Sequence, residues 1–127
     1  MNIFRALIFV GIGSGIGGML RYLVTRLLQN SFVTLFPLGT LAVNVLGCLL
    51  LGLLYGLFER GNLMNAELRL LLTVGICGGF TTFSTFINEN YSFLQNGNFL
   101  MSALYAALSL VLGMAAIYGG NYIIKLI

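Results

Sequence analysis

Between residues 75 and 86, adjacent glycines are followed by a cluster of hydroxyl side chains: Thr81, Thr82, Ser84 and Thr85. Gly78-Gly79 and the Ser/Thr cluster are poorly suited to a continuous helix. If this region spans a membrane, a break would free backbone carbonyls that can bind a cation. It would also direct the unpaired N–H groups of the next half-helix inward. The stretch therefore predicts an ion path made of neutral donors, and the alternative is a Ser/Thr-rich kink.

Two phenylalanines lie within this stretch at a spacing of three residues. Phe83 and Phe86 fall on one face of a helix. The edge of an aromatic ring carries the positive part of its quadrupole, so two such edges can face an anion. The alternative is that both rings simply pack against neighbouring helices.

Two further polar side chains stand alone in apolar surroundings elsewhere in the chain. Asn44 lies in the run Leu41–Gly47, and its amide offers two donors that suit anion coordination. Tyr105 lies among alanines, and its hydroxyl could complete a polar track. The alternatives are a hydrogen bond that joins two helices for Asn44, and an interfacial aromatic for Tyr105.

The charged residues nearest to these polar groups are Arg21 and Glu89. Arg21 follows a glycine run and is either an interfacial anchor beside Tyr22 or a positive charge at the mouth of an anion path. Glu89 follows the phenylalanines and is expected to be a solvated acid near the end of its helix.

The residue types that are missing exclude several kinds of chemistry. The sequence contains no His, and its three acidic residues are all Glu, so no Ser-His-Asp unit and no His-based metal site can form. Residues 13–18 match G-x-G-x-x-G, but they lie inside an apolar run without the strand and acidic residue of a dinucleotide site. The basic residues are scattered, which argues against nucleic acid as a partner. We expect a protein that is not an enzyme.

The elements that position these residues are set by composition. The 127 residues are 59% hydrophobic and 7% charged, against roughly 25% charged in soluble domains. A spanning helix needs about 20 apolar residues, so we expect one all-α transmembrane domain over residues 1–127. Asn65 and Asn98 are candidate N-caps of the last two helices. The four expected helices cover about residues 3–28, 38–58, 68–94 and 99–125.

Glycine spacing and charge placement bear on assembly. Small residues four apart let helix backbones approach closely in lipid, which favours a tight bundle and an oligomer. These pairs are Gly13/Gly17, Gly52/Gly56 and Gly75/Gly79. With both termini on one side, the six Lys and Arg residues divide about four to two, a weak bias that allows insertion in both orientations.

Three segments, in the same order, resemble the Fluc (CrcB-type) fluoride channels over essentially the whole chain. They are residues 17–22 (Gly-Gly-Met-Leu-Arg-Tyr), residues 39–47 around Asn44, and the stretch at residues 75–86. The resemblance implies a fluoride-selective channel that lets fluoride leave the cytoplasm passively and protects the cell from its toxicity. It further implies an antiparallel, dual-topology homodimer with two pores and a broken third helix, spanning the lipid bilayer of the cell inner membrane.

The same resemblance assigns roles to individual residues. Arg21 corresponds to the arginine near the vestibule. A single structural Na+ at the dimer centre is implied, held by the backbone carbonyls of Gly78 and Thr81 from both subunits. The implied fluoride pore is lined by Asn44, Phe83, Phe86, Ser84, Thr85 and Tyr105.

Two other classes of function are compatible with a small four-helix membrane protein. A proton-coupled drug exporter needs a titratable group within the membrane, and only Glu89, near the end of the third span, is available. A structural or lytic membrane protein needs no polar path. Coupling of transport to pH would indicate the exporter, and lysis on expression would indicate the lytic protein.

Overall fold

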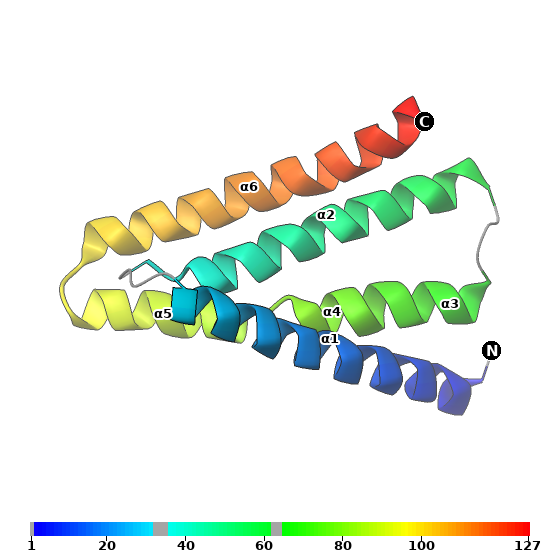
Figure 1. The fold of residues 1–127 in the computed structure, drawn as a ribbon, viewed down its shortest axis with the longest axis horizontal. Helices are drawn as coiled ribbons and strands as arrows, with labels where there is room; N and C mark the ends of the chain where they lie inside the picture. The colour runs from blue at the N-terminus through cyan, green and yellow to red at the C-terminus, as the bar shows by residue number, and fades with distance from the viewer. Residues whose placement is uncertain (1, 32–35, 62–64) are drawn as a thin grey trace.

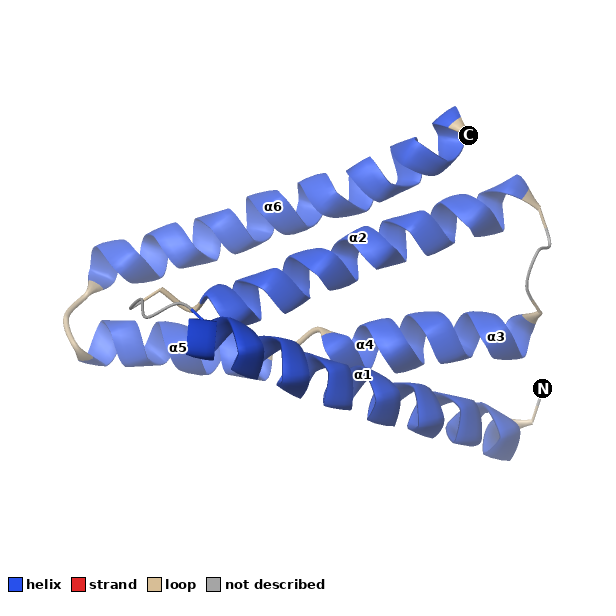
Figure 2. Cartoon of the chain, viewed as in Figure 1, coloured by secondary structure: helices blue, strands red, loops and turns tan. Residues whose placement is uncertain are grey.

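The computed structural model describes residues 2–31, 36–61 and 65–127, and its regular structure in these ranges is helical (Figure 2). Four segments are long and apolar enough to cross a membrane, namely Ile3–Gln29, Leu38–Arg60, Ala66–Gln95 and Phe99–Leu126. The elements in chain order are α1 (Ile3–Ser31), α2 (Leu38–Arg60), α3 (Ala66–Leu70), the π-helical η1 (Leu71–Cys77), α4 (Gly78–Phe80), α5 (Ser84–Gln95) and α6 (Phe99–Leu126).

Two of the helix starts were expected to carry asparagine caps. The side chain of Asn65 accepts a hydrogen bond from the amide of Leu68 at 2.8 Å, so this cap is confirmed. Asn98 occupies the N-cap position of α6, but its side chain makes no capping bond there, so its expected role is wrong. Instead, the backbone carbonyl of Asn98 accepts a bond from the Ser102 amide.

The helices form two closely packed groups, and both groups run along the long direction of the molecule (Figure 1). One group is α2 beside α6, and the other is α1 beside η1 and α4. The two chain ends lie at the same end of the bundle (Figure 1). At this end, Arg5 forms an ion pair with Glu67 at 2.7 Å, which joins the starts of α1 and α3.

Glycines set the contact between α1 and the third apolar segment. A methyl group added at Gly13 would meet the Cα of Gly75, and one added at Gly79 would meet the backbone of Ser14. Gly17 faces the backbone of Ile76 and Phe80 in the same way. The two helices therefore touch backbone to backbone, which only residues without a side chain allow.

Glycines also allow a close backbone contact between α2 and α6. A methyl group at Gly52 would collide with the backbone of Ile117, and one at Gly120 would collide with the backbone of Leu49 and Leu53. The small-residue pairs recognised in the sequence therefore pack helices within one chain. They support the expected tight bundle, but they carry no argument for an oligomer.

The outer surface of the bundle is apolar. Phe4, Leu110 and Tyr118 are each about 70% exposed, and apolar side chains are exposed along every long helix. Fully buried large side chains among the described residues are few, namely Tyr105 and Val43. This inversion of the usual soluble pattern fits a chain whose surroundings are hydrocarbon.

Candidate functional site

The helix of the third apolar segment is interrupted between α4 and α5, at residues 81–83. Thr81 has φ −86° and ψ 158°, an extended conformation, while its amide still donates to the Cys77 carbonyl at 3.0 Å. The Thr81 hydroxyl donates to the same carbonyl at 2.9 Å. Gly47 of α2 leaves room for the Thr81 methyl group, because a side chain at that position would overlap it. α2 is therefore shaped to lie against this turn.

The interruption diverts backbone amides from the carbonyls that they would bond in a continuous helix. The Gly78 carbonyl would accept from the Thr82 amide, but that amide donates to the Asn44 side chain at 2.7 Å. The Thr81 carbonyl would accept from the Thr85 amide, which instead points to the Thr82 hydroxyl at 3.4 Å. The two carbonyls expected to hold a cation are thus both released from their helical amides.

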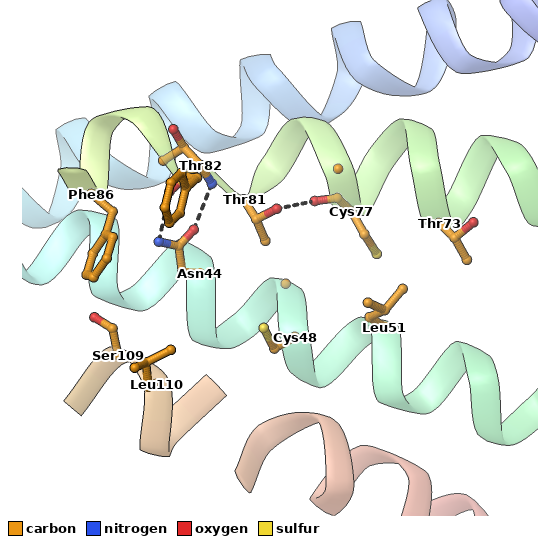
Figure 3. Close-up of a pocket in the computed structure, with 13 residues that line it drawn as sticks. Asn44, Cys48, Leu51, Thr73, Cys77, Thr81, Thr82, Phe86, Ser109 and Leu110 are labelled. Atoms are coloured by element: carbon orange, nitrogen blue, oxygen red, sulfur yellow. Dashed lines mark hydrogen bonds between the residues drawn. The ribbon is translucent and has the colours of Figure 1, made fainter. Parts of the chain in front are cut away.

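Asn44 fastens α2 to the interruption through two reciprocal hydrogen bonds. Its Oδ1 accepts from the Thr82 amide at 2.7 Å, and its Nδ2 donates to the Thr82 carbonyl at 3.1 Å (Figure 3). The side-chain amide of Asn44 thereby takes the place of a backbone partner for both the N–H group and the carbonyl of Thr82. An asparagine amide has two N–H groups, so the second one remains for another acceptor.

Arg21 also contacts the interruption. Its Nε donates to the Gly79 carbonyl at 3.0 Å, which links α1 to the last turn of α4. The sequence placed Arg21 either at the mouth of the path or beside Tyr22 as an anchor. In the structure, the residue that reaches the Tyr22 hydroxyl is the exposed Arg26, at 3.4 Å.

The two phenylalanines expected on one face are neighbours at the start of α5. Their ring centroids lie 6.1 Å apart at an angle of 40°. Phe86 is half-buried and its ring lies 5.0 Å from that of Tyr105. Phe83, in contrast, is 73% exposed in the single chain.

A cavity of about 390 Å³ connects these groups (Figure 3). Of the residues expected in the site, Asn44, Gly78, Thr81, Phe83 and Phe86 line it. Ser84 is exposed and Thr85 is half-buried, and they contribute no wall to it. Tyr105 lies behind Phe86 with no exposed surface.

Ser109 of α6 also lines the cavity, next to Leu110 (Figure 3). Its hydroxyl is buried and has no hydrogen-bond partner within the described part of the chain. Sequence reasoning missed it, because a single serine in a leucine-rich helix usually bonds to its own backbone. Its position facing Asn44 and Phe86 emerges only from the packing of α6 on α2.

Glu89 is not a solvated acid at the end of its helix, as the sequence had suggested. It is half-buried and accepts two hydrogen bonds, from the Tyr105 hydroxyl at 2.8 Å and from the Thr40 hydroxyl at 3.0 Å. The next residue, Asn90, accepts a hydrogen bond from the Ser102 hydroxyl at 2.8 Å and donates one to the Phe86 carbonyl at 2.9 Å. These contacts join α2, α5 and α6 into one polar cluster behind the phenylalanines.

The geometry defines a class of protein. Four apolar segments are long enough to cross a membrane, and the third of them is interrupted where uncharged amides, hydroxyls and carbonyls face a cavity. Among the described residues there is no group of three or more Cys, Asp or Glu residues that could hold a metal ion through side chains. This arrangement is that of a multi-pass membrane protein whose site offers neutral polar atoms.

Comparison with known proteins then identifies the family. Residues 8–121 match the family described as "CrcB-like protein, Camphor Resistance (CrcB)". The chain belongs to this family. A relative from Flavobacterium psychrophilum, named "Fluoride-specific ion channel FluC", is 40% identical over 121 residues, which cover 95% of this chain and 98% of the relative.

Two further relatives carry the same name. The protein from Phocaeicola vulgatus is 44% identical over 116 residues, covering 91% of this chain and 95% of the relative. The protein from Bacteroides fragilis is 44% identical over 123 residues, covering 94% and 95%. Each of these names describes an ion channel and not an enzyme.

Proposed function

We propose that this chain is a fluoride-specific ion channel that lets fluoride leave the cytoplasm down its gradient and so protects the cell from its toxicity. The observation that carries this proposal is the identity of 40–44%, over nearly the whole chain, to relatives named as fluoride-specific channels. The site is compatible with it, since neutral donors around an interrupted helix can replace the water shell of a small anion. Weak, multiple contacts also allow release, which a ring of fixed charges would hinder.

The proposed path follows the cavity and the start of α5. The second N–H group of Asn44 donates to the ion, while its first N–H group holds Thr82. Phe83 and Phe86 present ring edges, and Ser84, Thr85 and Tyr105 extend the polar track. Arg21, the only arginine among the described residues that contacts the interruption, supplies positive charge near the entrance.

A second copy of the chain completes the site in this proposal. Phe83 is 73% exposed in the single chain, which is unusual for a residue that lines an ion path. Four helices enclose little polar volume, and the apolar surface would accommodate both lipid and a partner. We propose an antiparallel homodimer with both orientations in the inner membrane, each copy helping to form two pores.

A structural Na+ at the centre of that dimer would be held by the carbonyls of Gly78 and Thr81 from both copies. The donors fit, because both are neutral oxygens that the interruption releases from their helical amides. A cation bound there would offset repulsion between anions in neighbouring pores. The protein's own contribution is to keep these carbonyls turned away from helical bonding, which the Asn44–Thr82 pair supports.

Growth of a bacterial strain that lacks its own fluoride exporter tests this function. Cells that express the chain should grow at fluoride concentrations that stop cells carrying an empty vector. Medium with the same concentration of chloride should not separate the two strains. Equal sensitivity to fluoride, with the protein present in the membrane fraction, would contradict the proposal.

A further inference from the structure

Arg21 lies on the same face of α1 as Gly13 and Gly17. Gly13, Gly17 and Arg21 recur every four residues, and both glycines touch the backbone of η1 and α4. Residues four apart in a helix share one face, so Arg21 is directed to the end of α4 by the same contact. Close packing at these glycines therefore brings the Arg21 side chain to the end of α4.

The carbonyl that Arg21 contacts is one that the interruption leaves without its helical amide. In a continuous helix, the Gly79 carbonyl would accept from the amide of Phe83, but α4 ends at Phe80. The Nε of Arg21 takes that place at 3.0 Å. A cation at the carboxyl end of a helix also opposes the partial negative charge of the last carbonyls.

The bond lies between the two carbonyls assigned to a cation. Gly79 is flanked by Gly78, whose helical amide is diverted to Asn44, and it precedes Thr81, whose helical amide is diverted to the Thr82 hydroxyl. Arg21 and Asn44 thus hold the interruption from two sides, one from α1 and one from α2.

We propose that Arg21 is a positioning residue, which binds the Gly79 carbonyl through Nε and thereby fixes the end of α4 at the interruption. This role differs from that of a charge that attracts anions, because it depends on a donor at one place and not on net charge. Its transport readout rests on the proposed channel function, but its structural readout does not.

Three substitutions separate the donor from the charge. In Arg21→Gln, the side-chain nitrogen lies the same number of bonds from Cα as the arginine Nε, without the charge. Arg21→Met has a similar length with neither donor nor charge, and Arg21→Lys keeps the charge one bond further out. Arg26→Met is the matched control, since it removes an exposed arginine from the same helix without touching the interruption.

Hydrogen–deuterium exchange of the peptide that covers residues 80–85, measured in lipid nanodiscs, is the primary readout. We expect Arg21→Met to speed exchange there about tenfold or more, from the loss of a charge-assisted hydrogen bond. Arg21→Gln should stay within about threefold of the native chain and Arg26→Met should match it. Fluoride efflux should follow the same order, with the Gln variant faster than the Met variant.

The proposal is overturned if the Gln variant exchanges as fast as the Met variant, or if the Met variant keeps native protection. Recovery by Lys but not by Gln would show that charge alone matters and would overturn it too. If the Met variant does not fold, the Gln and Lys variants decide the question. If the native chain conducts no fluoride, the channel function fails, while the exchange comparison still tests Arg21.

Discussion

The third and fourth apolar segments of this protein have similar dimensions but different backbones. The third contains 30 residues and its most apolar window has a mean hydropathy of 1.7, and α6 contains 28 residues with a value of 2.1. α6 runs as one helix from Phe99 to Leu126, whereas the third segment is divided among α3, η1, α4 and α5 (Figure 1). Length and hydropathy alone therefore do not decide whether a segment stays helical.

The difference lies in what the neighbouring helices supply. In hydrocarbon, a released N–H or C=O group must find a partner inside the protein. The third segment finds such partners in Asn44 of α2 and Arg21 of α1, at distances of 2.7–3.1 Å. α6 faces α2 through the small residues Gly52 and Gly120 and needs no such help. The irregular backbone of the third segment thus depends on side chains that α1 and α2 supply.

Removal of the Asn44 side-chain amide should have the largest effect. Asn44→Leu leaves both the amide and the carbonyl of Thr82 without their partner, and each unsatisfied group costs about 1–3 kcal/mol. We expect fluoride efflux from liposomes to fall about a hundredfold. The interruption would then lose the support that distinguishes it from α6.

Two comparisons sharpen that result. Asn44→Asp keeps an acceptor for the Thr82 amide but loses the donor and adds a charge, so it should also block fluoride efflux. Leu46→Ala, at a residue of α2 that is 50% exposed, should leave efflux within about twofold of the native rate. A fully active Asn44→Asp channel would remove Asn44 as a donor to the ion.

The phenylalanines at the start of α5 should have the next largest effect. Phe83→Ile and Phe86→Ile each remove a ring edge, and we expect each to lower fluoride efflux about tenfold. Phe83 is 73% exposed in the single chain, so its replacement should leave the fold of that chain intact. Size-exclusion chromatography would check assembly, and native efflux in both variants would rule out a role for the rings.

The two glycine interfaces should respond differently to added methyl groups. Gly17→Ala and Gly120→Ala both introduce a backbone collision and should each lower stability by about 1–3 kcal/mol. Gly17 lies beside the interruption, so only its variant should also slow efflux per folded protein. Gly18→Ala and Gly119→Ala are matched controls, because nothing lies within 4 Å of a methyl group there.

Thermal unfolding in detergent and efflux normalised to folded protein would measure the two effects separately. Equal loss of efflux at Gly17 and Gly120 would mean that the interruption is no more sensitive to packing than α6. The difference between the interface of α1 with the third segment and the interface of α2 with α6 would then have no effect on function.

Ser109 should have the smallest effect. Its buried hydroxyl lacks a partner within the described residues, so Ser109→Ala should leave stability unchanged to within about 1 kcal/mol. If the hydroxyl faces the ion in the cavity, efflux should fall about threefold. A decrease as large as that for Asn44→Leu would instead mean that α6 contributes as much to fluoride efflux as the third segment does.

The sequence predicted the helices well, because apolar runs of 20 or more residues and short polar turns leave few alternatives. Asn65 was found as a cap from its type and place alone. The region of residues 75–86 was singled out by its glycines and hydroxyls, and the structure places the break between α4 and α5 inside it.

The contacts between distant residues could not be predicted in this way. Arg21 and Gly79 are 58 positions apart, and Glu89 meets Thr40 and Tyr105 from two other helices. No local pattern encodes such a meeting, which depends on how helices rotate against each other. Glu89 was therefore expected to be solvated, and the hydroxyl of Ser109 was overlooked.

The most direct measurement is the release of fluoride and chloride from liposomes that contain the purified chain. We predict fast fluoride release, little chloride release, and no dependence on a pH gradient across the membrane. Asn44→Leu in the same preparation should lower the fluoride signal about a hundredfold. Equal release of both anions, or native fluoride release by the Asn44→Leu variant, would contradict the account of a fluoride path at the interruption.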